Sequence, residues 1–263
     1  KDYIETSPNP NAFTGEYSLE RFPTGIGTLD ELVEGGFPRP SAISILGDVG
    51  VGKSLLCWQI MWNALRRGVN VLFYLTEESA DEMKEGLLRY GWDIDIFEKE
   101  AKLRVVDIFS KGVKIAEESV MEPEELMKKS FSFFEILTEG HDYFYKTLRG
   151  KDLLVIFDSL STVFLVMELK KALSFLQNMK MATRAGRCVG ITTLHTRVHD
   201  DKTENIARSF SDGIIEMKAI EKGGKIIRYM NISKMNRTDY HQGICSYSIG
   251  KDGFTFSTQV FEY

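Results

Sequence analysis

An apolar run over residues 42–46 leads directly into the stretch Gly-Asp-Val-Gly-Val-Gly-Lys-Ser at residues 47–54. The first and last glycines of this Gly-x4-Gly-Lys-Ser pattern lack a Cβ, so successive backbone N–H groups can turn inward around an anion. An amphipathic pattern follows and predicts a helix over residues 54–67, whose N-terminus adds further N–H groups and a positive dipole end. The stretch therefore predicts a strand, a phosphate-binding loop and a helix in direct succession.

The positions of this loop have distinct expected roles in binding a nucleotide. Lys53 can reach the β- and γ-phosphates, and the Ser54 hydroxyl can bind Mg²⁺. A glycine-rich turn that matches by chance is the alternative, and the strand before the loop and the helix after it argue against that. No Asn/Thr-Lys-x-Asp motif for reading a guanine is present, so ATP with Mg²⁺ is the expected ligand. The predicted nucleotide-binding residues of the loop are Gly47, Asp48, Val49, Gly50, Val51, Gly52, Lys53, Ser54 and Leu55.

Apolar runs separated by helical patterns recur along the chain. Strands separated by helices of this length indicate right-handed crossovers and a mainly parallel sheet with helices on both faces. After about residue 212 the pattern alternates, and the strands expected there extend one edge of the sheet in antiparallel fashion. The sequence thus predicts strands over 42–46, 69–76, 103–108, 153–158 and 188–194, helices over 28–33, 79–90 and 169–185, and the later strands over 213–219, 225–233, 246–249 and 254–258.

Hydrolysis needs a carboxylate that organises Mg²⁺ and a group that activates water. The apolar strand over residues 153–158 ends in Asp158, where a carboxylate is unfavourable unless it faces a ligand crevice, so Asp158 is the predicted Mg²⁺ ligand beside Ser54. Glu77 and Glu78 follow the second strand at the same sheet edge. Glu77 is the predicted general base, with Glu78 assisting. The alternative is that both are helix-entry residues favoured by the dipole.

His195 follows the fifth predicted strand, again at this edge, and we expect it to sense the γ-phosphate and relay that state to the loop after it. A purely structural histidine is the alternative. The other three histidines show no metal-ligand spacing with one another or with the cysteines, so no metal other than the Mg²⁺ of the nucleotide is expected.

Composition bounds the possible partners and the domain organisation. A net charge of −5 gives no general attraction to nucleic acid. Three widely spaced cysteines in apolar runs are expected to be reduced core residues, and no run of 18 apolar residues or signal peptide is visible, so a cytoplasmic location is expected. We expect a loose arm over residues 1–20 and one domain over residues 21–263. Residues 111–150 are interpreted as a connecting helix with an acidic cap, or else as a partner-binding insertion.

Taken in order, five strings resemble the KaiC-like branch of the RecA superfamily of P-loop ATPases, which includes archaeal RadA paralogues. The resemblance implies a RecA-like ATPase core within the predicted α/β fold, and a ring of subunits, for which a hexamer is one candidate size, with ATP held between neighbours. The strings are Pro23-Thr24-Gly25-Ile26-x-x-Leu29-Asp30, Gly35-Gly36-x-Pro38, the phosphate loop, Thr76-Glu77-Glu78-Ser79 and Lys234-Met235-Asn236-Arg237-Thr238-Asp239.

The resemblance also implies roles for single residues. In this family the doubled glutamate carries the catalytic base, which supports Glu77, and the C-terminal Lys-Met-Arg-like motif reaches into the adjacent subunit's site, which points to Lys234. The family usually has Arg directly after the Met, whereas this chain has Asn236 there and Arg237 one residue later. Neighbouring strand residues face opposite sides, so Arg237 binds the neighbour's nucleotide only if a bulge intervenes. Slow turnover is therefore expected, since a cationic finger contributes on the order of 10³-fold or more. The alternative is that Lys234 and Arg237 lie on a solvated edge strand.

Three functions remain open at this point. The first is an ATPase whose ring regulates or remodels partners. The second is a recombinase paralogue that binds DNA through the segment after His195, where basic residues are offset by acidic ones; a flexible loop closing over the nucleotide is the alternative for that segment. The third is a nucleotide-gated scaffold with little turnover. A kinase has little support because no substrate lid is visible. The basic residues of the segment are Arg197, Lys202 and Arg208, with His199, and the acidic ones are Asp200, Asp201 and Glu204.

Overall fold

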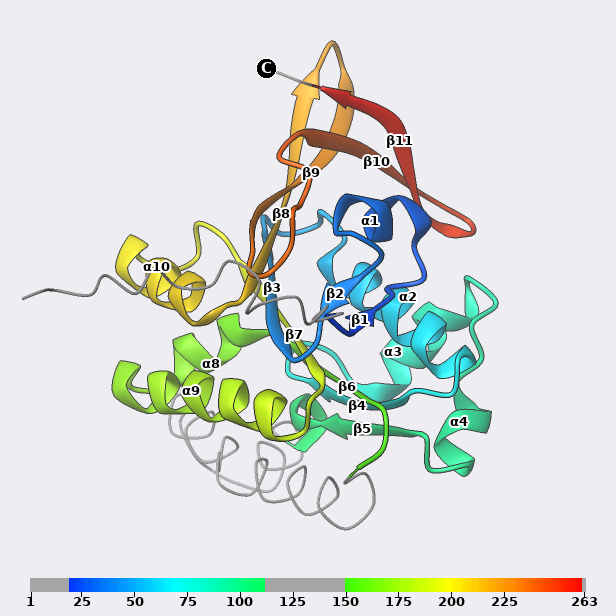
Figure 1. Cartoon of the computed structure of the whole chain (residues 1–263), viewed down its shortest axis with the longest axis vertical. Helices are drawn as coiled ribbons and strands as arrows, with labels where there is room; N and C mark the ends of the chain where they lie inside the picture. The colour runs from blue at the N-terminus through cyan, green and yellow to red at the C-terminus, as the bar shows by residue number, and fades with distance from the viewer. Residues whose placement is uncertain (1–18, 112–149, 262–263) are drawn as a thin grey trace, which may run out of the picture.

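A computed structural model of the chain describes residues 19–111 and 150–261 (Figure 1). Within them a nine-stranded sheet has the strand order β11-β10-β9-β8-β3-β7-β6-β4-β5. A separate pair of short antiparallel strands, β1 and β2, lies beside it. The strands are β1 (Arg21–Phe22), β2 (Phe37–Pro38), β3 (Ser41–Gly47), β4 (Asn70–Leu75), β5 (Leu103–Asp107), β6 (Leu153–Asp158), β7 (Val189–His195), β8 (Gly213–Lys222), β9 (Lys225–Met235), β10 (Ile244–Gly250) and β11 (Gly253–Phe261).

The half of the sheet from β5 to β8 is parallel, and the half from β8 to β11 is antiparallel. This confirms the predicted mainly parallel core with an antiparallel extension. One detail of the prediction was wrong: β8, expected to be antiparallel, pairs in parallel with β3 and is antiparallel only to β9. The reason is that a helix, α10 (Asp201–Phe210), lies between β7 and β8 and returns the chain to the end of the sheet where β7 begins, as a crossover connection between parallel strands requires.

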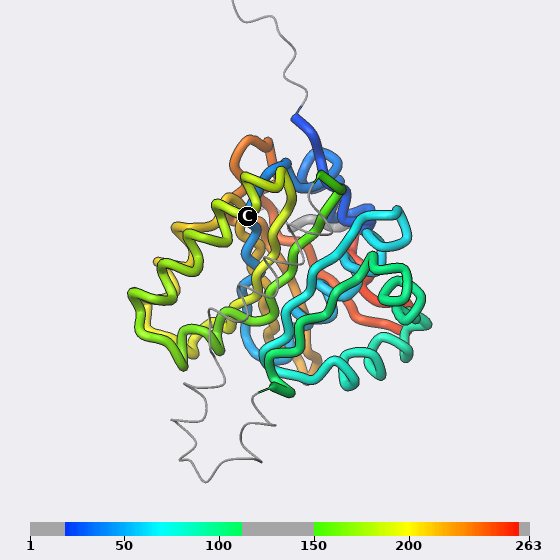
Figure 2. The backbone as a smooth tube through the Cα atoms, turned by 90° about the horizontal axis from the view of Figure 1, so that it is seen from below, coloured from blue at the N-terminus to red at the C-terminus, as the bar shows by residue number. Residues whose placement is uncertain are grey.

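Helices cover both faces of the sheet. Figure 2 shows the α9 side and the α3–α4 side separated by the strands. The buried side chains form two clusters, one on each face, because successive residues of a strand point to opposite sides. In β4, for example, Phe73 belongs to one cluster and Leu72 to the other. The helices are α1 (Gly27–Leu32), α2 (Lys53–Arg66), α3 (Ala80–Leu88), α4 (Asp95–Lys99), α8 (Leu160–Val166), α9 (Leu169–Ala185) and α10 (Asp201–Phe210).

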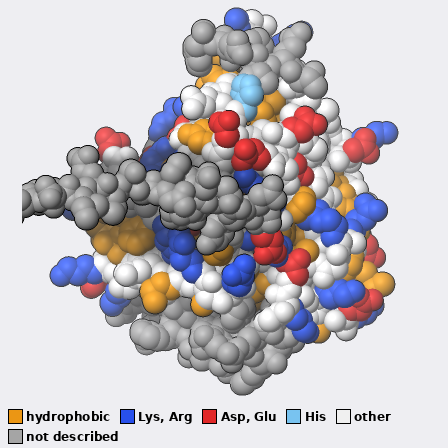
Figure 3. Space-filling view, viewed as in Figure 1, with side chains coloured by type: hydrophobic (Ala, Val, Ile, Leu, Met, Phe, Trp, Pro, Cys, Tyr) orange, Lys and Arg blue, Asp and Glu red, His pale blue; other side chains and the backbone are white. Residues whose placement is uncertain are grey.

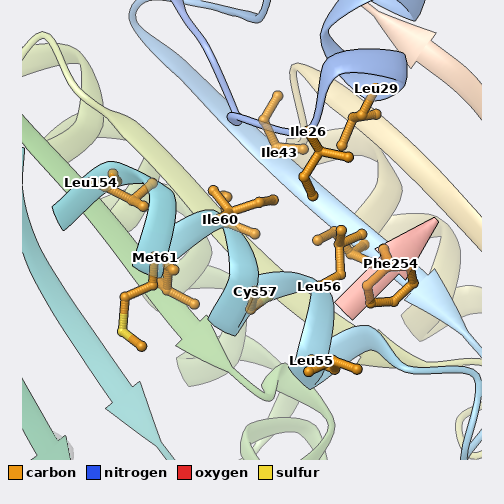
Figure 4. Packing of buried hydrophobic residues seen from close by; sticks show 14 of the residues in the cluster. Ile26, Leu29, Ile43, Leu55, Leu56, Cys57, Ile60, Met61, Leu154 and Phe254 are labelled. Atoms are coloured by element: carbon orange, nitrogen blue, oxygen red, sulfur yellow. The ribbon is translucent and has the colours of Figure 1, made fainter. Parts of the chain in front are cut away.

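Helix α2 is the element that fixes the phosphate loop to the core. Its apolar residues lie against the sheet and against the segment around α1 (Figure 4). Burying each large apolar side chain stabilises the fold by about 1.5–3 kcal/mol, so the start of this helix is firmly held. The residues of α2 labelled in Figure 4 are Leu55, Leu56, Cys57, Ile60 and Met61.

Local signals explain several element ends. Helix α3 is capped by Ser79, because the Ser79 hydroxyl accepts from the Glu82 N–H and the Glu82 carboxylate accepts from the Ser79 N–H. Helices α4, α8 and α10 were not expected from the sequence. Of these, α4 and α8 have five and seven residues, which leaves too few turns for a clear period.

The string at residues 23–30 has a structural role. The Asp30 carboxylate accepts hydrogen bonds from the N–H and hydroxyl of Thr24 and from the N–H of Gly25, at 2.6–3.0 Å. This network ties the chain entry to α1 and packs it on α2, since the Asn63 side chain donates to the Thr24 carbonyl. These residues therefore brace α2 and lie in none of the contacts of the phosphate loop described below.

Several sequence predictions lie outside the described residues. The interpretation of residues 111–150 falls almost entirely there. The loose arm over residues 1–20 falls outside except for residues 19 and 20, and the boundaries of one domain over residues 21–263 stay a prediction. In the described part of the chain, no helix is long and apolar enough to cross a membrane.

Candidate functional site

The phosphate loop joins the carboxyl end of β3 to the first turn of α2. At Gly47 a Cβ would lie 2.3 Å from the Met217 carbonyl oxygen of the neighbouring strand, so only glycine fits there. Gly52 has φ +100°, a left-handed conformation that side chains rarely adopt, and it is the residue from which α2 begins. The glycine spacing that predicted the loop is thus explained by one close approach and one backbone turn.

The side chains of the loop divide into inner and outer ones. Val51 is buried and Leu55 belongs to the core cluster, so these two hold the loop in place and offer a nucleotide only their backbone. Val49 lies at the exposed outer tip, with 75% of its surface accessible. Gly50, between the exposed Val49 and the buried Val51, has a positive φ.

Lys53 is the buried cation of the site. Its ammonium donates to the carbonyl oxygens of Gly47 and Asp48, at 2.9 and 2.8 Å, and contacts His195 Nδ1 at 2.9 Å. Burial lowers the pKa of Lys53, while the negative charges of Asp158 and Glu77 oppose that shift. The ammonium therefore lies inside the loop, within reach of any anion the loop encloses.

Asp158 and Ser54 form the predicted metal-binding pair. Asp158 is 5% exposed at the end of β6, and it accepts hydrogen bonds from Thr193 and from the Ser54 hydroxyl. Burial raises the pKa of Asp158, and those two hydrogen bonds oppose the increase. A hydroxyl and a carboxylate are the oxygen ligands that Mg²⁺ prefers. Beyond this pair, no cluster of three or more His, Cys, Asp or Glu able to hold a metal occurs among the described residues.

Glu77 is held by three donors at the end of β4. It accepts from the Ser159 hydroxyl at 2.6 Å, from Thr162 at 3.3 Å and from His195 Nε2 at 2.8 Å. Burial would raise the pKa of Glu77, but the hydrogen bonds from His195 and Ser159 outweigh it, so the pKa is lowered. The side chain remains 37% exposed, so this carboxylate is both ionised at neutral pH and open to water.

His195 connects the loop lysine to this glutamate. An ammonium can only donate, so His195 Nδ1 must accept from Lys53, and the proton of the neutral ring then lies on Nε2 and is donated to Glu77. The predicted position of His195 at the γ-phosphate edge is consistent with this contact. A movement of the Lys53 ammonium would therefore alter the hydrogen bond that His195 donates to Glu77.

Glu78 follows Glu77 in the chain, but its surroundings raise its pKa, whereas those of Glu77 lower the pKa. Burial, together with the negative charges of Asp158 and Glu82, raises the pKa of Glu78 from 4.5 to about 7. Two neighbouring carboxyl groups whose pKa values are separated by their surroundings can take different proton-transfer roles. Here Glu77 is the ionised member, and Glu78 is the one that holds a proton near neutral pH.

The raised pKa of Glu78 predicts a pH-dependent stability difference. Between pH 4.5 and about 7 the folded chain binds more protons at Glu78 than the unfolded chain does, so its contribution to stability is complete below that window and is lost as the pH rises through it. Because glutamine does not ionise, Glu78→Gln is expected to raise the thermal unfolding midpoint by several degrees at pH 8 relative to the parent chain, and this gap should close towards pH 5. Calorimetry without nucleotide measures it. Glu85→Gln, at an exposed position of α3, is the control; a gap at Glu78 that is constant with pH would contradict the assignment.

Asp48 links the loop to the turn after β7, a contact that the sequence did not reveal. Its carboxylate accepts from the Thr196 hydroxyl at 2.6 Å and pairs with the Arg197 guanidinium. The hydrogen bond from Thr196 is the main cause that lowers the pKa of Asp48. Thr193 in β7, Thr162 in α8, Ser159 and Thr196 were also missed, because single hydroxyl residues in or next to apolar elements carry no spacing signal.

The segment after His195 is not the loop that the sequence indicated. It makes a short turn and then forms α10, with the Asp200 carboxylate capping the helix by accepting from the Thr203 N–H at 2.7 Å. Arg197 is paired with Asp48, and Arg208 is paired with Glu216. On the visible face in Figure 3, basic side chains are interspersed with acidic ones. Two of the three basic residues of this segment are therefore paired with carboxylates.

Lys234 and Arg237 lie away from the phosphate loop, which follows the carboxyl end of β3. Lys234 pairs with Ile214 near the start of β8, and its ammonium donates to the Ser211 carbonyl at 2.7 Å. Arg237 lies in the turn after β9 and donates to the Pro40 carbonyl just before β3. Pro40 precedes β3, whose seven residues rise ~3.3 Å each, so Arg237 lies roughly 20 Å from the phosphate loop. Lys234 is level with Ser44, because Ile214 pairs with both, so it lies three residues, or roughly 10 Å, along the strands from Gly47 and two strands away from β3. Neither cation can reach the phosphate loop of its own chain.

A bulge is present, but it lies elsewhere than the sequence argument required. The register of β8 and β9 shifts between Ile214, which pairs with Lys234, and Ile215, which pairs with Ile232, and not between Lys234 and Arg237. Asn236 and Arg237 are already in a turn, where Arg237 has φ +61°. The alternation argument made from the sequence therefore does not apply to Arg237, because the strand has ended before it.

Together the sheet, the loop and the carboxylates around it define the class, a RecA-like P-loop ATPase domain. The chain belongs to the family described as "ATPase: KaiC", whose profile matches residues 22–260. Similar proteins include a UPF0273 protein of Aeropyrum pernix, 28% identical over 84% of this chain and 87% of its own length. Another, from Thermotoga maritima, is 26% identical over 84% of this chain and 89% of its own length.

A solved structure supports the fold. A KaiC-like protein of Pyrococcus horikoshii superposes with a TM-score of 0.69 and 22% sequence identity, covering 91% of this chain and 99% of that one. At this identity the likeness concerns the fold alone. The resemblance to the KaiC-like branch, stated from sequence motifs, is confirmed by the family match.

Proposed function

We propose that this chain binds ATP with Mg²⁺, hydrolyses it slowly, and assembles with copies of itself so that each nucleotide lies between neighbours. The observation that carries the proposal is the convergence of Lys53, Asp158 and Glu77, from three elements, at the carboxyl ends of the parallel strands, where His195 joins Lys53 to Glu77 and the Ser54 hydroxyl binds Asp158. The family match supports the ATPase part. Assembly and turnover rest on the geometry described above.

The residues present fit a nucleotide with its metal. The loop is closed by a glycine that leaves no room for a Cβ, and Ser54 and Asp158 offer oxygen ligands beside it. Bound Mg²⁺ would neutralise charge on the phosphates there. For phosphates to enter, the Lys53 ammonium must exchange its carbonyl partners at Gly47 and Asp48 for phosphate oxygens.

Glu77 is the residue positioned to activate water. Its carboxylate is ionised and partly exposed, and the donated hydrogen bonds fix its orientation. It takes a proton from a water that attacks the γ-phosphorus, and the bond from that phosphorus to the β–γ bridging oxygen breaks to release ADP. Glu78, which holds a proton near neutral pH, is suited to return one to the site.

The cations at the far sheet edge support assembly. Because Arg237 lies roughly 20 Å from its own phosphate loop and the Lys234 ammonium is bound to the Ser211 carbonyl, the phosphate loop of another copy is the target that we propose for them. Their current partners are backbone carbonyls at Ser211 and Pro40, which neutralise no charge. A neighbour that brings phosphates to this edge would supply the missing negative charge.

The proposal is tested by measuring ATP turnover with and without Mg²⁺, together with binding calorimetry and light scattering in the presence of a non-hydrolysable ATP analogue. We expect binding, Mg²⁺-dependent release of phosphate, and a larger assembly with the analogue. Binding without any phosphate release would instead indicate a nucleotide-gated scaffold. Absence of binding would overturn the proposal as a whole.

A further inference from the structure

The hairpin of β10 and β11 packs against the side of the phosphate loop that faces the protein interior. Tyr247 of β10 donates its hydroxyl to the Val51 carbonyl oxygen at 2.7 Å, and both residues are buried. The two positions are 196 residues apart in the chain. No sequence motif connects them, and the site described so far does not use this contact.

The hairpin is built so that Tyr247 points at the loop. The register between β10 and β11 shifts between Cys245 and Tyr247, and such irregularities re-aim a side chain. The Tyr247 ring packs on the rings of Phe254 and Phe256, with centroids 5.2 and 6.0 Å away. With its ring enclosed on this side, the hydroxyl has little freedom to leave the Val51 carbonyl.

The same hairpin touches the next residue of the loop and the helix behind it. A Cβ on Gly52 would lie 2.7 Å from Ile249 Cδ1 and 3.1 Å from Phe254 Cζ. The Phe254 N–H donates to the Gln59 side chain of α2 at 2.8 Å. The hairpin therefore contacts the loop and the helix that follows it at consecutive points.

The peptide between Val51 and Gly52 gives this contact its importance. A trans peptide is planar, so its carbonyl and its N–H point in opposite directions. When Tyr247 holds the Val51 carbonyl towards the interior, the Gly52 N–H must point the other way, away from the hairpin. A hydrogen bond accepted at the carbonyl also polarises the peptide and makes its N–H a stronger donor.

We propose that Tyr247 is a positioning residue for phosphate binding, which acts by fixing the orientation of the Val51–Gly52 peptide. The inference rests on the proposed nucleotide binding. Because Tyr247 acts through the backbone and touches no reacting atom, its loss weakens nucleotide binding and leaves the chemical step unchanged.

The test is Tyr247→Phe in the full chain, which keeps the ring packing and removes only the hydroxyl. Two measurements are made: amide hydrogen exchange of the loop peptide over residues 47–54 without nucleotide, and KM and kcat for Mg-ATP. We expect loop exchange to accelerate, and KM to rise about tenfold with kcat unchanged, as loss of one buried hydrogen bond allows. Tyr240→Phe, which removes a hydroxyl bound to the Ser233 carbonyl at 3.3 Å, is the matched control for loop exchange and KM.

The outcomes separate this proposal from the proposed function. Unchanged loop exchange in Tyr247→Phe would overturn the positioning role whether or not ATP binds. A parent chain that does not bind Mg-ATP would overturn the proposed function, while the exchange data would still decide the anchoring. A fall in kcat at constant KM would indicate a general loss of folded protein, and would also contradict the proposal. Should Tyr247→Phe fold poorly, Ile249→Val loosens the contact at Gly52 while keeping the hydroxyl, and is expected to give a smaller rise in KM.

Discussion

Replacing Lys53 with alanine is expected to weaken Mg-ATP binding by on the order of 100-fold or more. The ammonium is the one buried cation within hydrogen-bond reach of the loop carbonyls of Gly47 and Asp48, among the contacts described for the loop. A hydrogen bond to a charged group contributes about 1.5–3 kcal/mol, and Lys53 can make more than one to the phosphates. Isothermal titration calorimetry of the variant and the parent chain measures the change.

The control for this experiment is Lys99→Ala, which removes an exposed lysine at the end of α4 and is expected to bind as the parent does. The circular dichroism of the Lys53 variant should match that of the parent, because the core contacts of α2 are made by its apolar residues. If Lys53→Ala and the parent chain bound Mg-ATP equally well, the loop would not be a nucleotide site.

Glu77→Gln is expected to lower kcat by about 10²–10⁴-fold, the usual contribution of a positioned general base. The amide keeps the size of the side chain and can still accept the Ser159 hydrogen bond, but it cannot take a proton from water. Nucleotide affinity is expected to stay within a few fold, since Glu77 lies beyond the phosphate loop. Steady-state phosphate release and binding calorimetry separate the two effects.

Glu85→Gln, on the exposed side of α3, is the matched control and should leave turnover unchanged. Glu78→Gln distinguishes the two adjacent carboxyl groups: it is expected to lose less activity than Glu77→Gln. The reverse order would assign the base to Glu78, and equal turnover in both variants and the parent would remove the hydrolytic role of the pair.

Much of the fold could be predicted because local sequence patterns indicate many of its strands and helices. The strand over residues 153–158 and the helix over residues 169–185 have the bounds predicted for them, and β3, α2, β4 and β7 differ from prediction by one or two residues. Each of these elements has a long apolar period or sits beside a glycine. The short α4 and α8 have neither, which is why the sequence did not reveal them; α10 was missed because the segment after His195 was interpreted as a loop.

The site was predicted only in part, for a physical reason. Lys53, Ser54, Asp158 and Glu77 each stand at the end of an apolar strand or in the glycine loop, so sheet topology alone places them at one edge. The bridge through His195, the pair of Asp48 with Arg197, and the contact of Tyr247 with Val51 depend on side-chain direction and on a register shift. Those details are set by tertiary packing, and one-dimensional spacing does not contain them.

Lys234 and Arg237 are bound to backbone carbonyls of their own chain, away from its phosphate loop. If they serve a phosphate, it belongs to a different molecule, so an isolated copy would be an incomplete catalyst. The rate per copy would then climb with protein abundance and fall on dilution, and the amount of protein synthesised would itself act as the control on ATP consumption.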